Sequence, residues 1–180
     1  MASVANGPGV VALGAADRAA AVAAAKAQLR IAGTGEDALL GAFVESALGV
    51  AEQFLGMALI ARGMTAMLPA SADWQLLPAE PVGAIGAVTS GAVALPATSY
   101  AIDIDADARG WVRAPGVVSV AFTAGLATDW AGLPGAIRQG VSVLAAHLYD
   151  DRTGKARVPA AVTALWQPYR RMRVAIAVHA

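Results

Sequence analysis

Three carboxylates at alternate positions are the first candidates for chemistry in this chain. Asp103, Asp105 and Asp107 are separated by single apolar residues, and spaced carboxylates can hold calcium, as in the first half of an EF-hand loop. The rest of that loop is missing, because Ala108 stands where it needs glycine and Ala114 where it needs a bidentate glutamate. Alternation along a strand would place all three acids on one solvated face. We therefore predict no metal site.

The residues that could support nucleophilic catalysis are poorly arranged. Ser142 and His147 are five positions apart on one predicted helix, which is a poor geometry for a nucleophile and its base. No Gly-x-Ser-x-Gly turn surrounds any serine, and the absence of cysteine excludes thiolate catalysis, disulfides and cysteine-based zinc sites. The Gly33–Gly35 segment precedes a helix as phosphate loops do, but Glu36 and Asp37 would repel an anion. We expect no catalytic site and no cofactor, with a small hydrolase as a rival hypothesis.

Charge is distributed unevenly along the chain. The formal net charge is zero, yet residues 1–151 contain seven basic and thirteen acidic residues, whereas residues 152–180 contain six basic residues and no acid. Aromatic side chains are interleaved with these basic residues, and aromatics beside arginine are enriched in buried protein contacts. We interpret residues 152–180 as a docking arm. The side chains expected to make its contacts are Arg157, Trp166, Tyr169, Arg170, Arg171 and Arg173.

The basic segment has two other interpretations. It could bind nucleic acid through phosphate contacts, with an affinity that falls steeply with salt. It could also be a solvated tail. Six charges over this length are few for nucleic-acid binding, and the rest of the chain is net acidic. Because arginine forks match protein carboxylates well, we prefer a protein partner and keep nucleic-acid binding as the alternative function.

Composition indicates one domain with a thin core. A chain of 180 residues can bury a sizeable core, but alanine-rich helices bury little area per residue. Such a chain gains from burying surface against copies of itself, which predicts an oligomer. No basic residue precedes Arg18, and the longest uncharged span, 81–102, is interrupted by proline and glycine. We therefore expect a soluble protein with neither a signal peptide nor a membrane helix.

Apolar periodicity predicts the helices. An apolar residue recurs every three or four positions between Leu40 and Phe54, which defines the clearest helix, and Gly56 is placed to end it. Thr34 and Asp37 form a Thr-x-x-Asp pattern that can cap its start. The predicted helices cover residues 17–30, 35–55 and 134–150, followed by a short helix from Pro159 to Trp166.

Between the second and third predicted helices the pattern changes to that of strands. Val118, Val120 and Phe122 alternate with small or polar residues, as in a half-buried strand. We predict a small antiparallel sheet over about residues 59–123, inserted between the helices, and an α+β fold class. The expected organisation is a flexible leader at 1–15, a domain at 16–151 and an extended basic arm at 152–180.

Several segments together resemble one protein family. Glu52–Ile60 is similar to the helix exit and first strand of the head–tail connector (adaptor) proteins of tailed phages and gene transfer agents. Val118–Gly125 resembles the final strand of that family, Leu133–Tyr149 the helix after it, and Leu165–Arg170 its usual C-terminal motif. The resemblance extends over roughly residues 17–173 and depends on the order and spacing of these motifs.

The resemblance implies a structural protein without enzymatic activity. Family members form a ring, typically of twelve subunits, below the portal of the capsid, where the ring extends the DNA channel and offers a surface to the next tail component. The implied partners are further copies of this chain, the portal protein, bound through the C-terminal segment, and a tail or stopper protein. DNA is expected to pass through without specific binding, and no membrane is involved. The implied location is the head–tail interface of a virion assembled in the bacterial cytoplasm.

Overall fold

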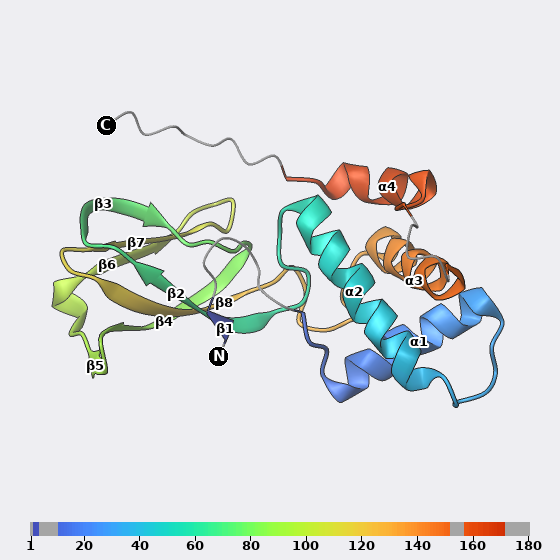
Figure 1. Ribbon diagram of the computed structural model, residues 1–180. Helices are drawn as coiled ribbons and strands as arrows, with labels where there is room; N and C mark the ends of the chain where they lie inside the picture. Colours follow the sequence, from blue (N-terminus) through green and yellow to red (C-terminus); the bar gives the residue numbers. More distant parts are fainter. Residues whose placement is uncertain (1, 4–10, 152–156, 172–180) are drawn as a thin grey trace.

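The helices and strands of the protein gather in two lobes, as the computed structural model in Figure 1 shows. The structure describes residues 2–3, 11–151 and 157–171. The predicted helices at 17–30, 35–55 and 134–150 lie over the first three observed ones. The helices are α1 (Ala15–Leu29), α2 (Asp37–Leu55), α3 (Gly135–Asp150) and α4 (Ala160–Trp166), and α4 runs into a 3₁₀ turn, η2 (Gln167–Tyr169).

The strands form two sheets where the sequence predicted one. The larger sheet has the strand order β1-β2-β8-β4-β5 and the smaller has the order β3-β7-β6. All pairs are antiparallel except β1 with β2. The bounds are β1 (Ala2–Ser3), β2 (Arg62–Leu68), β3 (Ser71–Leu76), β4 (Val82–Ser90), β5 (Val93–Ala94), β6 (Ala101–Ile104), β7 (Gly110–Ala114) and β8 (Val118–Ala124), with a 3₁₀ turn, η1 (Ala97–Ser99), before β6.

Both sheets contribute to one apolar core in the strand lobe. Val120 and Phe122 on β8 and Val112 on β7 are buried in the same cluster. Two short sheets that pack against each other each bury one apolar face. A single sheet would leave that face in water unless another element covered it. The α+β fold class is therefore confirmed, with the strand region divided into two layers.

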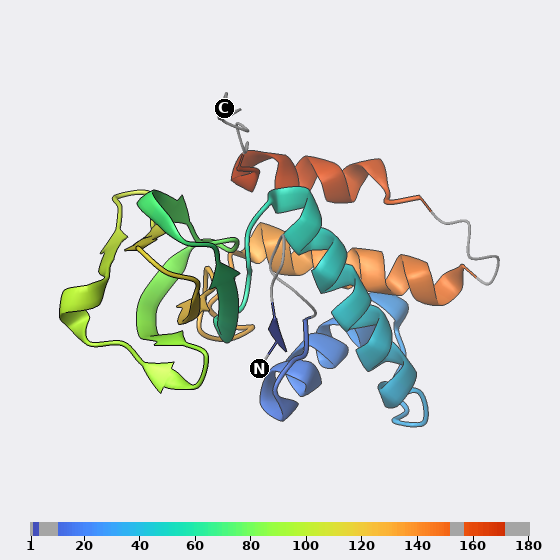
Figure 2. The same cartoon turned by 60° about the vertical axis from the view of Figure 1, so that its left-hand side comes forward.

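Helix α2 is the centre of the helical lobe. It contacts α1, α3 and α4, and Figure 2 shows it crossing in front of α1 and α3. By length and composition alone it could cross a membrane, but Val44, Leu48 and Leu55 are completely buried against the other helices. Burial inside the lobe is the behaviour of a core helix. Gly56 ends α2 in the left-handed conformation (φ 74°), as predicted.

The start of α2 differs from the predicted capping pattern. Glu36 occupies the N-cap position, and no side chain there bonds a free backbone N–H. The Asp37 carboxylate instead accepts a hydrogen bond from Lys26 Nζ at 2.7 Å, so it ties α2 to α1. The helix starts at Asp37 and not at 35, and its acid pairs with α1 instead of capping α2.

Two segments expected to be extended or flexible are packed in part. Val11 is buried, and the Leu13 N–H donates to Glu45 Oε1 at 3.2 Å, so the end of the predicted leader lies on the helical lobe. Within the predicted arm, α4 packs against α2 and α3. The remaining parts of the leader and arm, residues 1, 4–10, 152–156 and 172–180, lie outside the described residues.

Candidate interaction site at the C-terminal segment

Trp166 fixes the C-terminal segment to the helical lobe. Its side chain is completely buried, its ring centroid lies 5.9 Å from that of Phe54 on α2, and its Nε1–H donates weakly to the Ile137 carbonyl at 3.4 Å. Gly140 on α3 makes room, since a Cβ there would lie 2.2 Å from Trp166 Nε1. The prediction that Trp166 makes docking contacts is thus corrected: the ring belongs to the core and positions its neighbours.

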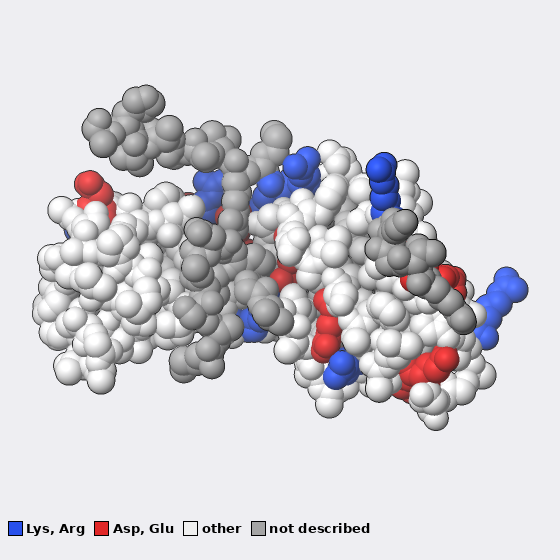
Figure 3. All heavy atoms as spheres, viewed as in Figure 1, with Lys and Arg blue, Asp and Glu red and all other residues white. Residues whose placement is uncertain are grey.

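The exposed part of this segment is basic. The Arg170 guanidinium lies over the Phe54 ring, 5.5 Å from its centroid, and is exposed beside half-buried Tyr169. Arg157, on the other side of α4, is exposed too. In the view of Figure 3, basic groups lie along the upper edge, where Figure 1 places α4 and the lobe junction. We call the exposed side chains before and after α4, Arg157, Gln167, Pro168 and Arg170, the C-terminal surface.

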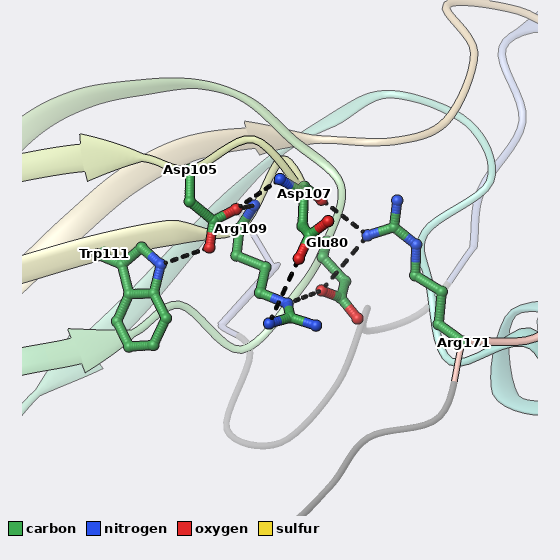
Figure 4. Close-up of polar contacts among 6 residues, drawn as sticks. All are labelled: Glu80, Asp105, Asp107, Arg109, Trp111 and Arg171. Atoms are coloured by element: carbon green, nitrogen blue, oxygen red, sulfur yellow. Dashed lines mark hydrogen bonds and ion pairs between the residues drawn. The ribbon is translucent and has the colours of Figure 1, made fainter.

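Arg171 connects the end of this segment to both lobes. Its N–H donates to the Leu55 carbonyl at 3.0 Å, at the C-terminal end of α2. Its guanidinium reaches into the strand lobe (Figure 4), where Nη1 donates to the Asp107 carbonyl at 2.9 Å and lies 3.6 Å from Glu80 Oε2. The C-terminal segment therefore meets the junction at a fixed point. Arg173, the last predicted contact residue, lies outside the described residues.

Glu80 is the acceptor that sequence reasoning missed. Its carboxylate is mostly buried and lies 3.6 Å from both Arg171 Nη1 and Arg109 Nε. Arg109 in turn lies 3.7 Å from the Asp107 carboxylate. The contact joins residues about ninety positions apart in sequence, so no local pattern could have revealed it.

The three alternating aspartates do not form the exposed row that the sequence predicted. Strand β6 ends at Ile104, and Asp105 lies in the turn that follows. Its Oδ1 accepts the backbone N–H groups of Asp107 and Arg109, and its Oδ2 accepts Trp111 Nε1–H, each at 2.9 Å. The bond from Trp111, followed by those from the backbone, lowers the pKa of Asp105. Among the described residues no group of three metal-binding side chains is present.

Ser142 and His147 do not form a catalytic pair. The Ser142 hydroxyl is buried and donates to the Arg138 carbonyl at 2.9 Å, one helical turn earlier. A hydroxyl bonded back to its own helix in this way is a structural feature of helices. The geometry gives no support to the hydrolase hypothesis.

A buried ion pair lies at the helix exit that carries the family resemblance. Glu52, 1% exposed, forms two 2.7 Å bonds with the Arg62 guanidinium and accepts the Leu59 N–H at 2.8 Å. The pair ties the end of α2 to the start of β2. The sequence did not predict that Glu52 and Arg62 form an ion pair. An acid near the C-terminal end of a helix is nevertheless unfavourable on its own and indicates a partner. Met57, just after the end of α2, is buried as well.

Comparison with known proteins identifies the kind of assembly. A search of family models and a search of curated proteins gave no match. Among solved structures, the chain is similar to a chain in the neck of an empty gene transfer agent particle, solved with C6 symmetry, with 29% identity and a TM-score of 0.69 over 85% of this chain and 90% of that one. It is also similar to a chain in the virion of a native gene transfer agent particle, with 29% identity and a TM-score of 0.67 over 92% and 95%.

The sequence identity to a third solved structure reaches 30% over most of both chains. This structure is a chain in the neck of a native gene transfer agent particle, solved with C12 symmetry, with 30% identity and a TM-score of 0.64 over 86% of this chain and 92% of that one. The fold defines a structural component of the neck of a phage-like particle. The chain belongs to the head–tail connector family of tailed phages and gene transfer agents.

Proposed function

We propose that this protein is the adaptor that joins the portal of a phage-like capsid to its tail, and that the C-terminal surface docks on the portal. The observation that carries the proposal is that one buried side chain fixes the C-terminal segment while two charged side chains on the segment stay exposed. Trp166 is buried in the helical lobe, while Arg157 and Arg170 on the same segment face solvent. An exposed arginine on a pre-organised segment binds a carboxylate partner with little loss of conformational entropy.

The adaptor is proposed to act as a closed ring around the DNA channel. The similar neck structures were solved with C6 and C12 symmetry, which favours a ring and, with the family resemblance, a dodecamer. The segment before Asp151 is net acidic, and a channel wall that does not attract phosphate would let DNA slide. In this proposal the ring binds the portal on one side and a tail or stopper protein on the other, and performs no catalysis.

Co-sedimentation with the portal protein of the same particle tests the proposal. Removing every residue after Asp151 would also remove Trp166 and open the core, so substitutions are the better test. The double variant Arg157→Glu/Arg170→Glu reverses both exposed charges and leaves Trp166 in place. Gln167→Ala on the same surface is the matched control, because it changes an exposed side chain without changing charge.

The charge-reversed variant should lose portal binding by at least tenfold, and the control should bind as the wild type does. Equal binding by all three proteins would move the contact away from the C-terminal surface, and failure of the wild type to bind an intact portal would contradict the adaptor role. The nucleic-acid alternative predicts instead that the charge reversal abolishes a salt-dependent affinity for free DNA. The adaptor proposal expects little affinity for free DNA in the wild type.

A further inference from the structure

Strand β3 lies at an edge of the three-stranded sheet. It is the first strand in the order β3-β7-β6, and among the described residues only β7 pairs with it. The strand at the other edge, β6, contacts β4 of the larger sheet. In Figure 1, β3 forms the upper border of the strand lobe, on the side of the molecule on which α4 ends. We call the side of β3 that faces away from β7 the open edge.

The register of the sheet directs backbone groups of β3 toward the open edge. The Leu77 N–H donates to the Gly110 carbonyl at 2.8 Å, and the residue before it, Leu76, is paired with Trp111. Because hydrogen-bonded and non-hydrogen-bonded pairs alternate along antiparallel strands, the N–H and C=O of Leu76 point away from β7. A row of outward backbone groups is a template for pairing with a further strand.

Large apolar side chains border the open edge. Trp74 is 43% exposed and Leu76 is 49% exposed. Proteins protect such edges with charged residues, with proline or with a covering segment. Strand β3 contains no proline, and Asp73 is its single charged residue. The strand itself therefore protects the edge weakly, which favours a covering segment.

The residues that follow Arg171 have the sequence of a strand. Between Val174 and Val178 a β-branched residue alternates with alanine, in the order Val-Ala-Ile-Ala-Val. This alternation is typical of a strand with one larger apolar face. Proline and glycine are absent from residues 172–178, so nothing in their composition opposes strand pairing. The placement of these residues lies outside the described part of the chain.

Arg171 brings this segment to the correct end of β3. Its guanidinium donates to the Asp107 carbonyl and lies 3.6 Å from Glu80 Oε2 (Figure 4). Glu80 follows β3 in the chain, so β3 runs toward this point. A chain that leaves Arg171 along β3 is therefore antiparallel to it and needs no crossover connection. At about 3.3 Å per residue, residues 172–178 span about 23 Å when extended, and the six residues of β3 span about 20 Å.

We propose that residues 174–178 pair as a strand with the open edge of β3 in the same subunit. In this arrangement Val174, Ile176 and Val178 lie on the same face as Trp74 and Leu76, because residues opposite each other in paired strands share a face. The pairing satisfies the outward backbone groups and removes exposed apolar surface from water. The free subunit thus covers its own adhesive edge and does not pair edge to edge with other copies. The proposal concerns the free subunit and does not depend on the adaptor role.

Hydrogen exchange of the Leu76 amide tests the pairing in the full chain. In Ala175→Pro/Ile176→Pro one of the two lost N–H groups must face β3, since successive N–H groups of a strand point to opposite sides. Ala175→Val/Ile176→Val keeps both N–H groups and is the matched control. The Leu76 amide should exchange at least about tenfold faster in the proline variant than in the wild type or the control, whereas amides in β8 should not change. The same exchange rate at Leu76 in all three proteins would overturn the proposal.

Cysteine pairs identify the segment that covers the edge. The chain contains no cysteine, so each introduced pair reports one contact. Leu76→Cys is combined in turn with cysteine at positions 174, 175, 176, 177 and 178, and disulfides formed under mild oxidation are separated by non-reducing electrophoresis. An even position should form a disulfide within one chain, and the odd positions should not, because alternate side chains lie on opposite faces. Val93→Cys/Ile176→Cys is the control and should stay reduced, since Val93 is 69% exposed on β5 of the other sheet.

Three other outcomes would assign the edge differently. Disulfides formed only between two chains would show that a second copy covers the edge. Equal yields at all five positions would show a segment without a fixed register on β3. Protection of the Leu76 amide that appears only when the portal is present would assign the edge to that partner. Each of these results would overturn the proposed pairing within the subunit.

Discussion

At the scale of single residues, the buried carboxylate of Glu52 is a strong local constraint on the chain. Its two oxygens are satisfied by Arg62 and by the Leu59 N–H, and a charge removed from water is stable only when it is paired and hydrogen-bonded. The pair also orients the chain as it passes from α2 into β2. It therefore joins the two lobes by a contact that tolerates little change in geometry.

Replacing Arg62 alone should strongly destabilise the folded protein. Arg62→Met leaves the Glu52 carboxylate buried without its cation, and the free energy of unfolding should fall by about 3–5 kcal/mol, measured by urea denaturation. The double variant Glu52→Leu/Arg62→Met removes both charges and should be less destabilised than the single variant, although the Leu59 N–H then lacks its acceptor. Equal stabilities for the single and double variants would show that the pair has no special role.

The turn at Asp105 should make stability depend on acid pH. Because the folded state holds the pKa of Asp105 below its ordinary value of 3.8, the ionised side chain stabilises the folded state above that value, and this contribution is lost as pH falls through the lower, folded pKa. The stability difference between the wild type and Asp105→Asn should thus be largest above about pH 4 and shrink below it. Chemical denaturation at several pH values measures this, with Asp103→Asn as the control. A difference that does not change with pH would contradict the assignment.

At the scale of elements, the packing of α4 depends on the absence of a side chain at Gly140 in α3. A Cβ at position 140 would lie 2.2 Å from Trp166 Nε1, so Gly140→Ala must displace Trp166 and loosen α4. Overpacking of this kind costs about 1–3 kcal/mol. Hydrogen exchange should rise over residues 160–169, and the melting temperature should fall. Gly135→Ala on the same helix is the control, because nothing lies within 4 Å of a Cβ there, and it should show neither change. Unchanged exchange in Gly140→Ala would contradict the role of this contact.

The same elements show what a sequence can and cannot predict. The apolar repeat of α2 and the alternation of β8 predicted those elements because periodicity reports which face of an element is apolar. Periodicity does not report which partner covers that face, so the second sheet and the packing of α4 were not predicted. Trp166 was misassigned for the same reason: an aromatic residue among arginines is typical of interfaces, but the decisive fact was a glycine at position 140, a distant part of the chain.

The polar site at the junction was the least predictable part. Glu80, Asp107 and Arg171 meet only after both lobes and the C-terminal segment are in place. The charges themselves are unremarkable in sequence, and the resemblance to the connector family supplied the functional class without the contact. What the sequence did contain was the charge division between residues 1–151 and 152–180, which drew attention to this segment.

At the scale of the whole molecule, Arg171 couples the C-terminal segment to the relative position of the lobes. One guanidinium contacts the strand lobe while the backbone of the same residue bonds to the end of α2. A partner that binds the C-terminal segment near Arg171 would therefore act on the junction and not on α4 alone. In the proposed adaptor, this would transmit portal binding to the strand lobe.

This coupling predicts that one substitution can lower portal affinity while leaving the stability of the fold almost unchanged. Arg171→Gln removes the guanidinium contacts to Glu80 and Asp107 but keeps the backbone bond to Leu55, so the free energy of unfolding should change by less than about 1 kcal/mol, as for other part-exposed ion pairs. Portal affinity should nevertheless fall several-fold, because the end of the C-terminal segment at Arg171 is no longer fixed to the strand lobe. Arg109→Gln is the matched control: it removes an equally long contact to Glu80 without touching the C-terminal segment, and should leave portal binding unchanged. If the two variants bind the portal equally well, the junction only stabilises the fold, and portal recognition depends on the C-terminal surface alone.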